Sequence, residues 1–218
     1  MKKALYALCI ALVIISFCSC KNTENEIKDE TIYTINNEIV TQAEAEYFTK
    51  KIKPEIISHY IAEYSVVYDE SFWTTEYDGT TPQEALENAV KEQIALAKIQ
   101  LILCREHGIY EDISYRGLYG LALQYNEAHK NNQSVGLTSI PMDSFYDYYL
   151  DNGIMELKNI LGENELKPTE DEINNTINEI KKKYPNKTED EQLSIANDII
   201  VEKKYDDYIS KLYSELDA

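Results

Sequence analysis

The chain has 218 residues, about one to one and a half times the length of a typical domain. Its 44% hydrophobic and 28% charged residues suit a chain with a buried core, while only 7 Gly and 5 Pro argue against a many-stranded sandwich or barrel. The formal charge is −18, and a field of that sign repels nucleic acid and anionic lipid headgroups, so nucleic acid is excluded as a partner.

The N-terminal segment has the pattern of an export signal. Lys2 and Lys3 precede the mostly apolar run Ala4 to Phe17, which is shorter than the ~20 residues that span a bilayer as a helix. The following Cys18-Ser19-Cys20 resembles a bacterial lipobox, in which a small residue stands directly before the lipidated cysteine. The resemblance implies a lipoprotein signal peptide at residues 1–19 and acyl chains such as palmitate on Cys20. An ordinary cleaved secretory signal is the alternative interpretation.

The remaining chain is expected to face an extracytoplasmic space. Residues 20–30 are polar, and we interpret them as a tether that joins the lipid anchor to a single helical domain at residues 31–218. The anchor would lie on the outer face of a bacterial cell membrane, or in the outer membrane where one exists. With Cys9 and Cys18 removed and Cys20 acylated, only Cys104 keeps its thiol, so no disulfide can form. Cys104 lies in an apolar helical run, which favours a place in the core over a role as nucleophile.

The mature chain is predicted to open with a β-hairpin followed by a long helix. Ile32 to Ile35 and the residues up to Val40 form two short apolar stretches around Asn36-Asn37, a pair that tolerates the positive φ of a tight turn. Thr41 with Glu44 is a capping box that predicts a helix start. The apolar spacing continues this helix to about Asp69, with a kink or break near Lys53 ahead of Pro54.

The next segment combines a structured loop with the most strongly patterned helix. The loop at residues 70–80 holds the only Trp, Trp73. Thr81 is an expected N-cap with Pro82 at the first helical position, and the helix should cover residues 85–107. Apolar residues nearly surround its second half, so we expect it at the centre of the core. Gly108 is the expected C-terminal stop.

The rest of the chain is predicted to be helical as well. We expect a helix at residues 112–129, a polar loop at 131–139, a helix from Pro141, and a turn at Asn152-Gly153. Capping boxes at Thr169 and Thr188 start two later helices, the last of which should run from 189 to about 216. Its expected buried residues are Ile195, Ile199, Ile200, Tyr205, Tyr208, Ile209 and Leu212. The predicted fold is therefore mostly all-α, with six to eight helices and at most one small N-terminal β-hairpin.

No catalytic, phosphate-binding or metal-binding motif is recognisable in the sequence. His59, His107 and His129 are isolated, and the spacing of Cys104 and His107 on one helix face lacks the second pair that a metal site needs. Acidic runs such as residues 170–172 lie at expected helix N-termini, where the macrodipole accounts for them. We expect no metal, no cofactor and no enzymatic activity. A hydrolase whose site leaves no sequence pattern is a further alternative.

Aromatic composition suggests a binding surface. The chain has 18 Tyr against 4 Phe and 1 Trp, and Tyr combines large apolar contact with a hydroxyl that can bind a backbone. Most of these tyrosines are expected in the core. The candidates for a peptide-binding groove are the large aromatics in or beside loops and helix starts: Phe72, Trp73, Tyr77, Phe145, Tyr146 and Tyr149.

The order of these motifs resembles the N-terminal chaperone domain of SurA/PrsA-type foldases and, more loosely, the peptide-cradling arm of trigger factor. The resemblance rests on Ile32 to Thr41 before the first helix, Ala97 to Ile109 at a helix stop, paired aromatics Tyr148-Tyr149, the helix start Pro168 to Ile173, and a final helix from Glu189 to Leu216. It covers most of the mature chain.

The sequence departs from this family in one respect, which concerns catalysis. Foldases of this type usually carry a parvulin-like prolyl isomerase domain before the last helix, whereas here only residues 174–188 intervene and no two Gly residues are adjacent. The resemblance implies a membrane-tethered chaperone or holdase without isomerase activity, which would hold unfolded secreted or surface polypeptides in a cradle between the N-terminal hairpin region and the C-terminal helices. The alternative is a non-enzymatic surface lipoprotein, used in adhesion, assembly or binding of one dedicated partner, with the same fold as a scaffold.

Overall fold

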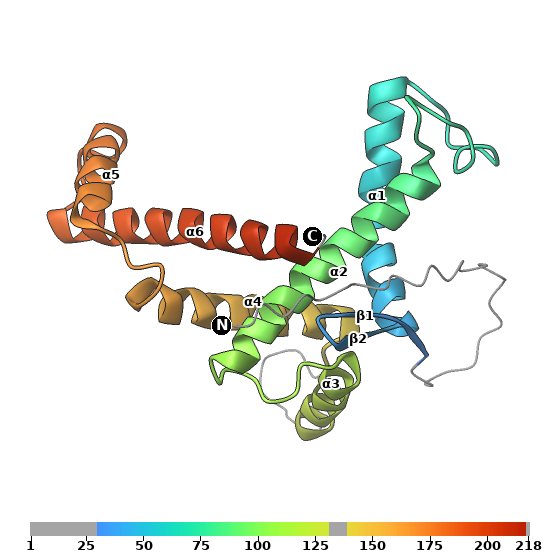
Figure 1. Cartoon of the computed structure of the whole chain (residues 1–218), viewed down its shortest axis with the longest axis horizontal. Helices are drawn as coiled ribbons and strands as arrows, with labels where there is room; N and C mark the ends of the chain where they lie inside the picture. Colours follow the sequence, from blue (N-terminus) through green and yellow to red (C-terminus); the bar gives the residue numbers. More distant parts are fainter. Residues whose placement is uncertain (1–29, 131–138, 217–218) are drawn as a thin grey trace, which may run out of the picture. The chain divides into compact units, whose positions relative to one another are not determined.

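The computed structural model describes residues 30–130 and 139–216, so the expected signal peptide, Cys20 and most of the tether lie outside the described residues. Within that part, helices dominate and one two-stranded antiparallel sheet stands at the N-terminal end, which confirms the predicted mostly-α fold (Figure 1). The elements are β1 (Thr31–Ile35), β2 (Glu38–Thr41), α1 (Gln42–Tyr64), α2 (Pro82–Glu106), α3 (Tyr115–His129), α4 (Met142–Glu163), α5 (Glu170–Lys183) and α6 (Glu189–Leu216).

The chain divides into two compact units. The first contains the described residues up to Lys98 together with Asp112–Tyr146, and the second contains Ile99–Glu111 together with the described residues from Asp147 onward. Helices α2 and α4 each contribute to both units. None of the described helices is long and apolar enough to cross a membrane.

The β-hairpin forms as its turn residues predict. Asn36 and Asn37 have φ of 47° and 68°, the pair of positive values that a tight two-residue turn requires and that Asn tolerates. The antiparallel register pairs Tyr33 with Val40 and Ile35 with Glu38, and an irregularity follows Thr31. The hairpin delivers the chain directly to α1.

Helix α1 begins as predicted but ends earlier. The Thr41 hydroxyl accepts a hydrogen bond from the backbone N–H of Glu44 at 3.3 Å, which caps the first turn. The helix continues through Pro54, so the expected break near Lys53 is absent. It stops at Tyr64 and not near Asp69, because Ser65 adopts a left-handed conformation, with φ of 54° and ψ of 34°, that ends the helical hydrogen bonding.

Helix α2 supplies much of the buried apolar surface, as its sequence predicts. Thr81 caps its start, with Glu84 accepting hydrogen bonds from the Thr81 backbone N–H at 2.9 Å and hydroxyl at 3.0 Å. Gly108, with φ of +72°, follows its end. Cys104 is fully buried, which confirms its predicted place in the core. The buried helix residues between 94 and 104 are Ile94, Ala95, Ala97, Lys98, Ile99, Leu101, Leu103 and Cys104.

The expected turn at Asn152-Gly153 is wrong, because α4 runs through both residues. Asn152 donates from its side-chain amide to the Tyr148 carbonyl at 2.6 Å and so stays within helical geometry. Gly153 meets a different requirement, close packing: a Cβ there would lie 2.6 Å from Tyr110 Cε2 and 3.0 Å from Cys104 Sγ. Gly153 therefore lets Tyr110 and Cys104 pack closely against α4, and it does not end the helix.

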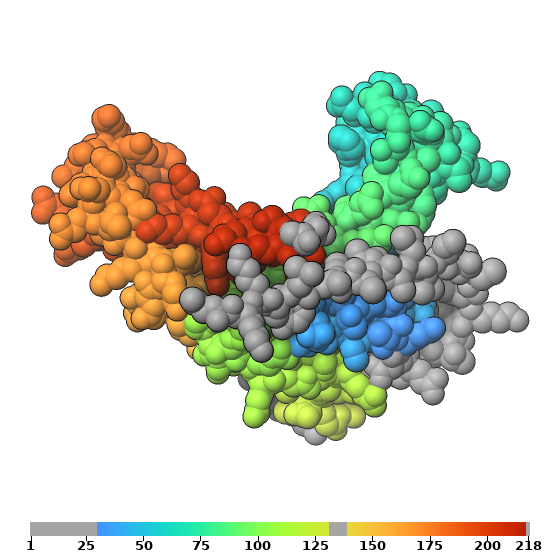
Figure 2. Space-filling view, in the orientation of Figure 1, coloured from blue at the N-terminus to red at the C-terminus, as the bar shows by residue number. Residues whose placement is uncertain are grey.

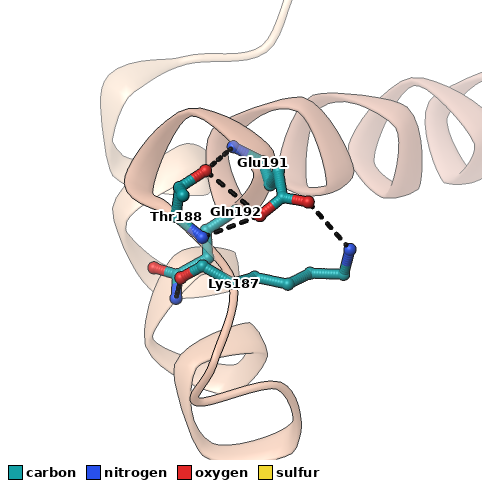
Figure 3. Close-up of polar contacts among 4 residues, drawn as sticks. All are labelled: Lys187, Thr188, Glu191 and Gln192. Atoms are coloured by element: carbon teal, nitrogen blue, oxygen red, sulfur yellow. Dashed lines mark hydrogen bonds and ion pairs between the residues drawn. The ribbon is translucent and has the colours of Figure 1, made fainter.

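Helices α5 and α6 of the second unit pack against each other near the start of α6, and both helix starts are capped as predicted (Figure 1). At α6, Thr188 donates from its N–H to Glu191 at 2.8 Å and accepts from the Glu191 N–H at 3.3 Å (Figure 3). Lys187 also reaches Glu191 at 3.4 Å. Thr169 and Glu172 repeat this reciprocal arrangement at α5.

The predicted buried face of α6 is partly correct. Ile200, Tyr205 and Ile209 are buried, and Tyr205 donates its hydroxyl hydrogen to Gln100 at 2.9 Å. Ile195, Tyr208 and Leu212 are half-buried. Ile199 is 51% exposed, so its predicted burial is wrong. The buried face of α6 is therefore narrower than the face that its apolar spacing predicts.

Candidate functional site

The structure places the six predicted groove aromatics in three different surroundings. Phe72, Trp73 and Tyr77 come together in the loop between α1 and α2. Phe145 and Tyr146 are buried in the first unit, with 8% and 1% exposure. Tyr149 belongs to the second unit, where its ring stacks on Tyr110 with centroids 3.8 Å apart. The loop is therefore the place where half of the predicted residues gather.

We call residues 60–80 the aromatic tip. They comprise the last turn of α1 and the loop that leads to α2, at the end of α1 opposite the β1–β2 hairpin (Figure 1). The six aromatic side chains of the tip are Tyr60, Tyr64, Tyr68, Phe72, Trp73 and Tyr77.

Local hydrogen bonds give the tip a defined backbone. The Asp69 carboxylate accepts from the Ser71 N–H at 2.9 Å and the Ser71 hydroxyl at 2.8 Å, and these bonds lower the pKa of Asp69 below its ordinary value. Tyr77 and Thr80 exchange backbone hydrogen bonds of 3.0 and 3.1 Å across a turn at Asp78-Gly79, where φ is positive at both residues. The loop is therefore an ordered structure, as the sequence predicts.

A buried ring stands at the centre of the tip. Phe72 is 1% exposed, and its ring centroid lies 5.0 Å from Tyr68, 5.1 Å from Trp73 and 6.2 Å from Tyr60. Edge-to-face and tilted contacts at such distances stabilise aromatic pairs beyond the area they bury. The Trp73 indole N–H donates to the Tyr68 hydroxyl at 3.3 Å. Phe72 thus braces the neighbouring rings and does not itself present a surface.

The outer side of the tip exposes apolar residues. Val67 is 76% exposed, Tyr68 50% and Ile61 39%, while Trp73 and Tyr77 are half-buried. This segment is coloured cyan to green in the space-filling view (Figure 2). Sequence reasoning missed the exposure of Val67 and Tyr68, because it continued the first helix to about Asp69, whereas α1 ends at Tyr64. Val67 and Tyr68 are adjacent in the chain, and neighbouring exposed apolar residues are a usual mark of a contact surface.

The tip is also acidic. Between residues 54 and 90 the chain contains eight carboxylates and no Lys or Arg. These are Glu55, Glu63, Asp69, Glu70, Glu76, Asp78, Glu84 and Glu87. The nearest cation is Lys53 at the base, whose Nζ lies 5.0 Å from the Trp73 ring centroid. The tip therefore offers aromatic faces, apolar side chains and negative charge in one place.

A second group of polar side chains is closed to solvent. Lys98 Nζ lies 2.9 Å from Glu44 Oε2, and both side chains are 1% exposed. Tyr146 donates its hydroxyl hydrogen to Glu44 Oε1 at 3.1 Å. Burial raises the pKa of Glu44, although Lys98 and its hydrogen bonds act in the opposite direction. Because no substrate can reach these groups, we assign the Glu44–Lys98 pair to the core and not to a site.

Sequence reasoning missed the Glu44–Lys98 pair for an identifiable reason. Glu44 fits a capping box, which accounts for an acid at that position without a partner elsewhere. The signal for Lys98 was available: it lies four residues after Ile94 and three before Leu101, on the apolar side of α2. A lysine on such a stripe needs a buried counter-ion.

Two remaining candidates lack the features of a reactive site. Burial raises the pKa of the Cys104 thiol to about 12, which keeps it protonated and unreactive at neutral pH. Tyr110 next to it donates its hydroxyl hydrogen to the Tyr149 carbonyl at 2.7 Å, so Tyr149 is part of the internal packing of the second unit. Among the residues described, no group of three or more His, Cys, Asp or Glu side chains is placed to hold a metal ion.

No family model, curated protein or solved structure matches the chain. The functional site is therefore argued from the geometry of its residues alone. The resemblance to SurA/PrsA-type foldases accordingly stays a prediction that rests on the sequence motifs quoted above. The aromatic tip is the site that the geometry favours, and what it offers is contact surface.

Proposed function

We propose that this protein is a lipid-anchored extracytoplasmic chaperone of the holdase type, which binds unfolded polypeptide segments at its aromatic tip and has no prolyl isomerase activity. One observation carries the proposal: Val67, Tyr68 and Ile61 are exposed on a framework that Phe72 holds from within. An exposed apolar surface of this kind costs solubility unless a partner covers it. The carboxylates around it offset that cost by keeping the free protein soluble.

Two further features support the proposal. The order of helix starts and stops resembles the SurA/PrsA-type pattern, in which peptide binding is the role of the helical domain. The chain passes from α5 to α6 through residues 184–188, the place where such foldases usually insert their isomerase domain. A holdase needs no nucleotide and no reactive group, so binding by contact alone would account for the function.

Suppression of aggregation tests this function. A soluble form that begins at Lys21 is added to a heat-unfolded model protein at up to about four molar equivalents, without ATP, and light scattering is recorded. We expect scattering to fall with the dose, and the double variant V67S/Y68S to lose at least half of the effect because its exposed apolar contact is removed.

A matched control separates the tip from apolar surface in general. Tyr148 is 62% exposed and Leu123 53%, so Y148S/L123S removes one tyrosine and one aliphatic residue elsewhere. This variant should suppress aggregation as the unmodified protein does. If the folded protein does not suppress aggregation at any dose, general chaperoning is wrong, and the tip would serve one dedicated partner to be sought by pull-down.

A further inference from the structure

The carboxylates of the aromatic tip differ in whether they accept hydrogen bonds from neighbouring residues. Asp69 is bound by Ser71, and Asp78 is bound by the Tyr64 hydroxyl at 3.1 Å. Just beyond the tip, Glu84 is bound by Thr81. Glu63, Glu70 and Glu76 are exposed and have no hydrogen-bond or ion-pair partner in the described part of the chain. Three carboxylates of the tip are therefore available to a ligand.

These three free carboxylates flank the exposed apolar residues. Glu63 precedes Val67 and Tyr68 by about one helical turn, Glu70 follows them by two residues, and Glu76 lies in the same loop. No cationic side chain between residues 54 and 90 neutralises them. A segment that binds at Val67 and Tyr68 is thus surrounded by uncompensated negative charge.

The aromatic rings favour the same sign of charge. The Lys53 ammonium lies 5.0 Å from the centroid of Trp73, a cation–π distance, which illustrates that the tip accommodates a cation over an aromatic face. Tyr68 is half exposed and can offer its ring to an incoming Lys or Arg in the same way. The same Lys or Arg of the ligand can then be bound both by a cation–π contact and by a carboxylate.

We infer that the aromatic tip selects cationic segments of unfolded polypeptide, in which Lys or Arg alternates with apolar residues. The inference rests on the proposed function and names its substrate class. The apolar residues of such a segment cover Val67 and Tyr68, while its cations pair with Glu63, Glu70 and Glu76. Acidic segments are rejected at the same surface, because like charges would be brought together without a counter-ion.

Three synthetic peptides of equal length and equal apolar content test the selection. Their alternating positions carry Lys and Arg, Gln, or Glu, and binding to the purified full chain in nonionic detergent is measured by fluorescence anisotropy. At about 20 mM salt we expect the cationic peptide to bind roughly tenfold more tightly than the Gln peptide, and the Glu peptide most weakly. At about 500 mM salt the advantage should fall to roughly twofold, because the charges are screened.

Two charge-matched variants locate the effect. E63Q/E70Q/E76Q removes three charges at the tip, and D198N/D206N/D207N removes three exposed charges from the shallow acidic face of α6. The tip variant should bind the cationic and Gln peptides about equally. The α6 variant should keep the full preference, although its net charge is the same. Far-UV circular dichroism confirms that both variants are folded.

The outcomes separate this inference from the function it rests on. Equal binding of the three peptides by the unmodified chain, with binding lost in V67S/Y68S, overturns the charge selection and leaves the holdase proposal standing. Binding of none of the peptides overturns both. A preference that survives in the tip variant, or that falls equally in both variants, shows that the overall charge of the chain is responsible and overturns the assignment to the tip.

Discussion

At the scale of single residues, the buried Glu44–Lys98 pair bears directly on stability. Removing two charges from water costs several kcal/mol for each ion, and only close pairing with further hydrogen bonds offsets this cost. Here the pairing distance is 2.9 Å, and the Tyr146 hydroxyl donates a hydrogen bond to the other carboxylate oxygen at 3.1 Å. The pair links the start of α1, the middle of α2 and the start of α4, so it joins parts of the first unit that are distant in sequence.

Replacement of Lys98 by Met should reveal this dependence. At pH 8 we expect the free energy of unfolding to fall by about 3–5 kcal/mol, because Glu44 stays buried without its cation. Burial already raises the pKa of Glu44 above 4.5. The folded state therefore binds the proton more tightly than the unfolded chain, so the penalty is absent below pH 4.5 and grows as pH rises through the folded-state pKa. Urea unfolding at pH 8 and pH 4.5 measures both values.

The control for this prediction is an exposed lysine. K203M on α6 should change the free energy of unfolding by less than about 0.5 kcal/mol at either pH. The double variant E44Q/K98M should recover part of the loss at pH 8, since no buried charge then remains. A loss in K98M that is as small as in K203M, or that is equal at both pH values, would contradict the role assigned to the pair.

At the scale of elements, hydrogen bonds within four residues decide where helices start. Thr41, Thr81, Thr169 and Thr188 each cap a helix, and each stands three residues before a Glu. By contrast, Gly153 depends on neighbours that are distant in sequence: its missing Cβ makes room for Tyr110 and Cys104. A capping motif therefore specifies a boundary by itself, whereas a glycine does not.

Two glycine-to-alanine substitutions should have opposite effects on stability. Alanine favours a helix by about 1 kcal/mol over glycine, so G120A in α3, where no atom lies within 4 Å of the added Cβ, should stabilise the protein by up to that amount. G153A in α4 should destabilise it by about 1–3 kcal/mol, because its Cβ would overlap Tyr110 Cε2 at 2.6 Å. Thermal unfolding by circular dichroism compares them, and a stabilising G153A would contradict the packing described here.

The difference between local motifs and long-range packing explains which parts of the fold and of the tip can be predicted from the sequence. The hairpin turn at Asn36-Asn37, the caps and the last helix are local patterns and were predictable. The aromatic tip was predictable in part: Trp73 and Tyr77 were identified, but the burial of Phe72 and the exposure of Val67 depend on how the loop folds. Burial of a side chain depends on residues that are distant in sequence and pack against it. The local spacing of apolar residues therefore does not predict it.

At the scale of the whole molecule, the charges are unevenly distributed along the chain. Nine lysines lie in the second unit between residues 158 and 211, and several of them pair internally. Lys158 pairs with Glu202 at 2.6 Å and Lys204 with Glu172 at 2.7 Å. The tip in the first unit keeps its carboxylates uncompensated. Some of the basic residues thus serve internal structure in the second unit, whereas no lysine or arginine falls within the tip itself.

A chain with this excess of negative charge gains no attraction from anionic lipid headgroups, so its retention at a membrane should depend on the lipid proposed for Cys20. In cells that express the full chain, we expect the protein in the membrane fraction and labelled by radioactive palmitate. C20A should lose the label and should not appear as the processed, membrane-held form, whereas the control C18A should keep both label and location. An unlabelled protein released from the cell in unmodified form would instead identify the segment as an ordinary secretory signal, and the protein would then act unanchored.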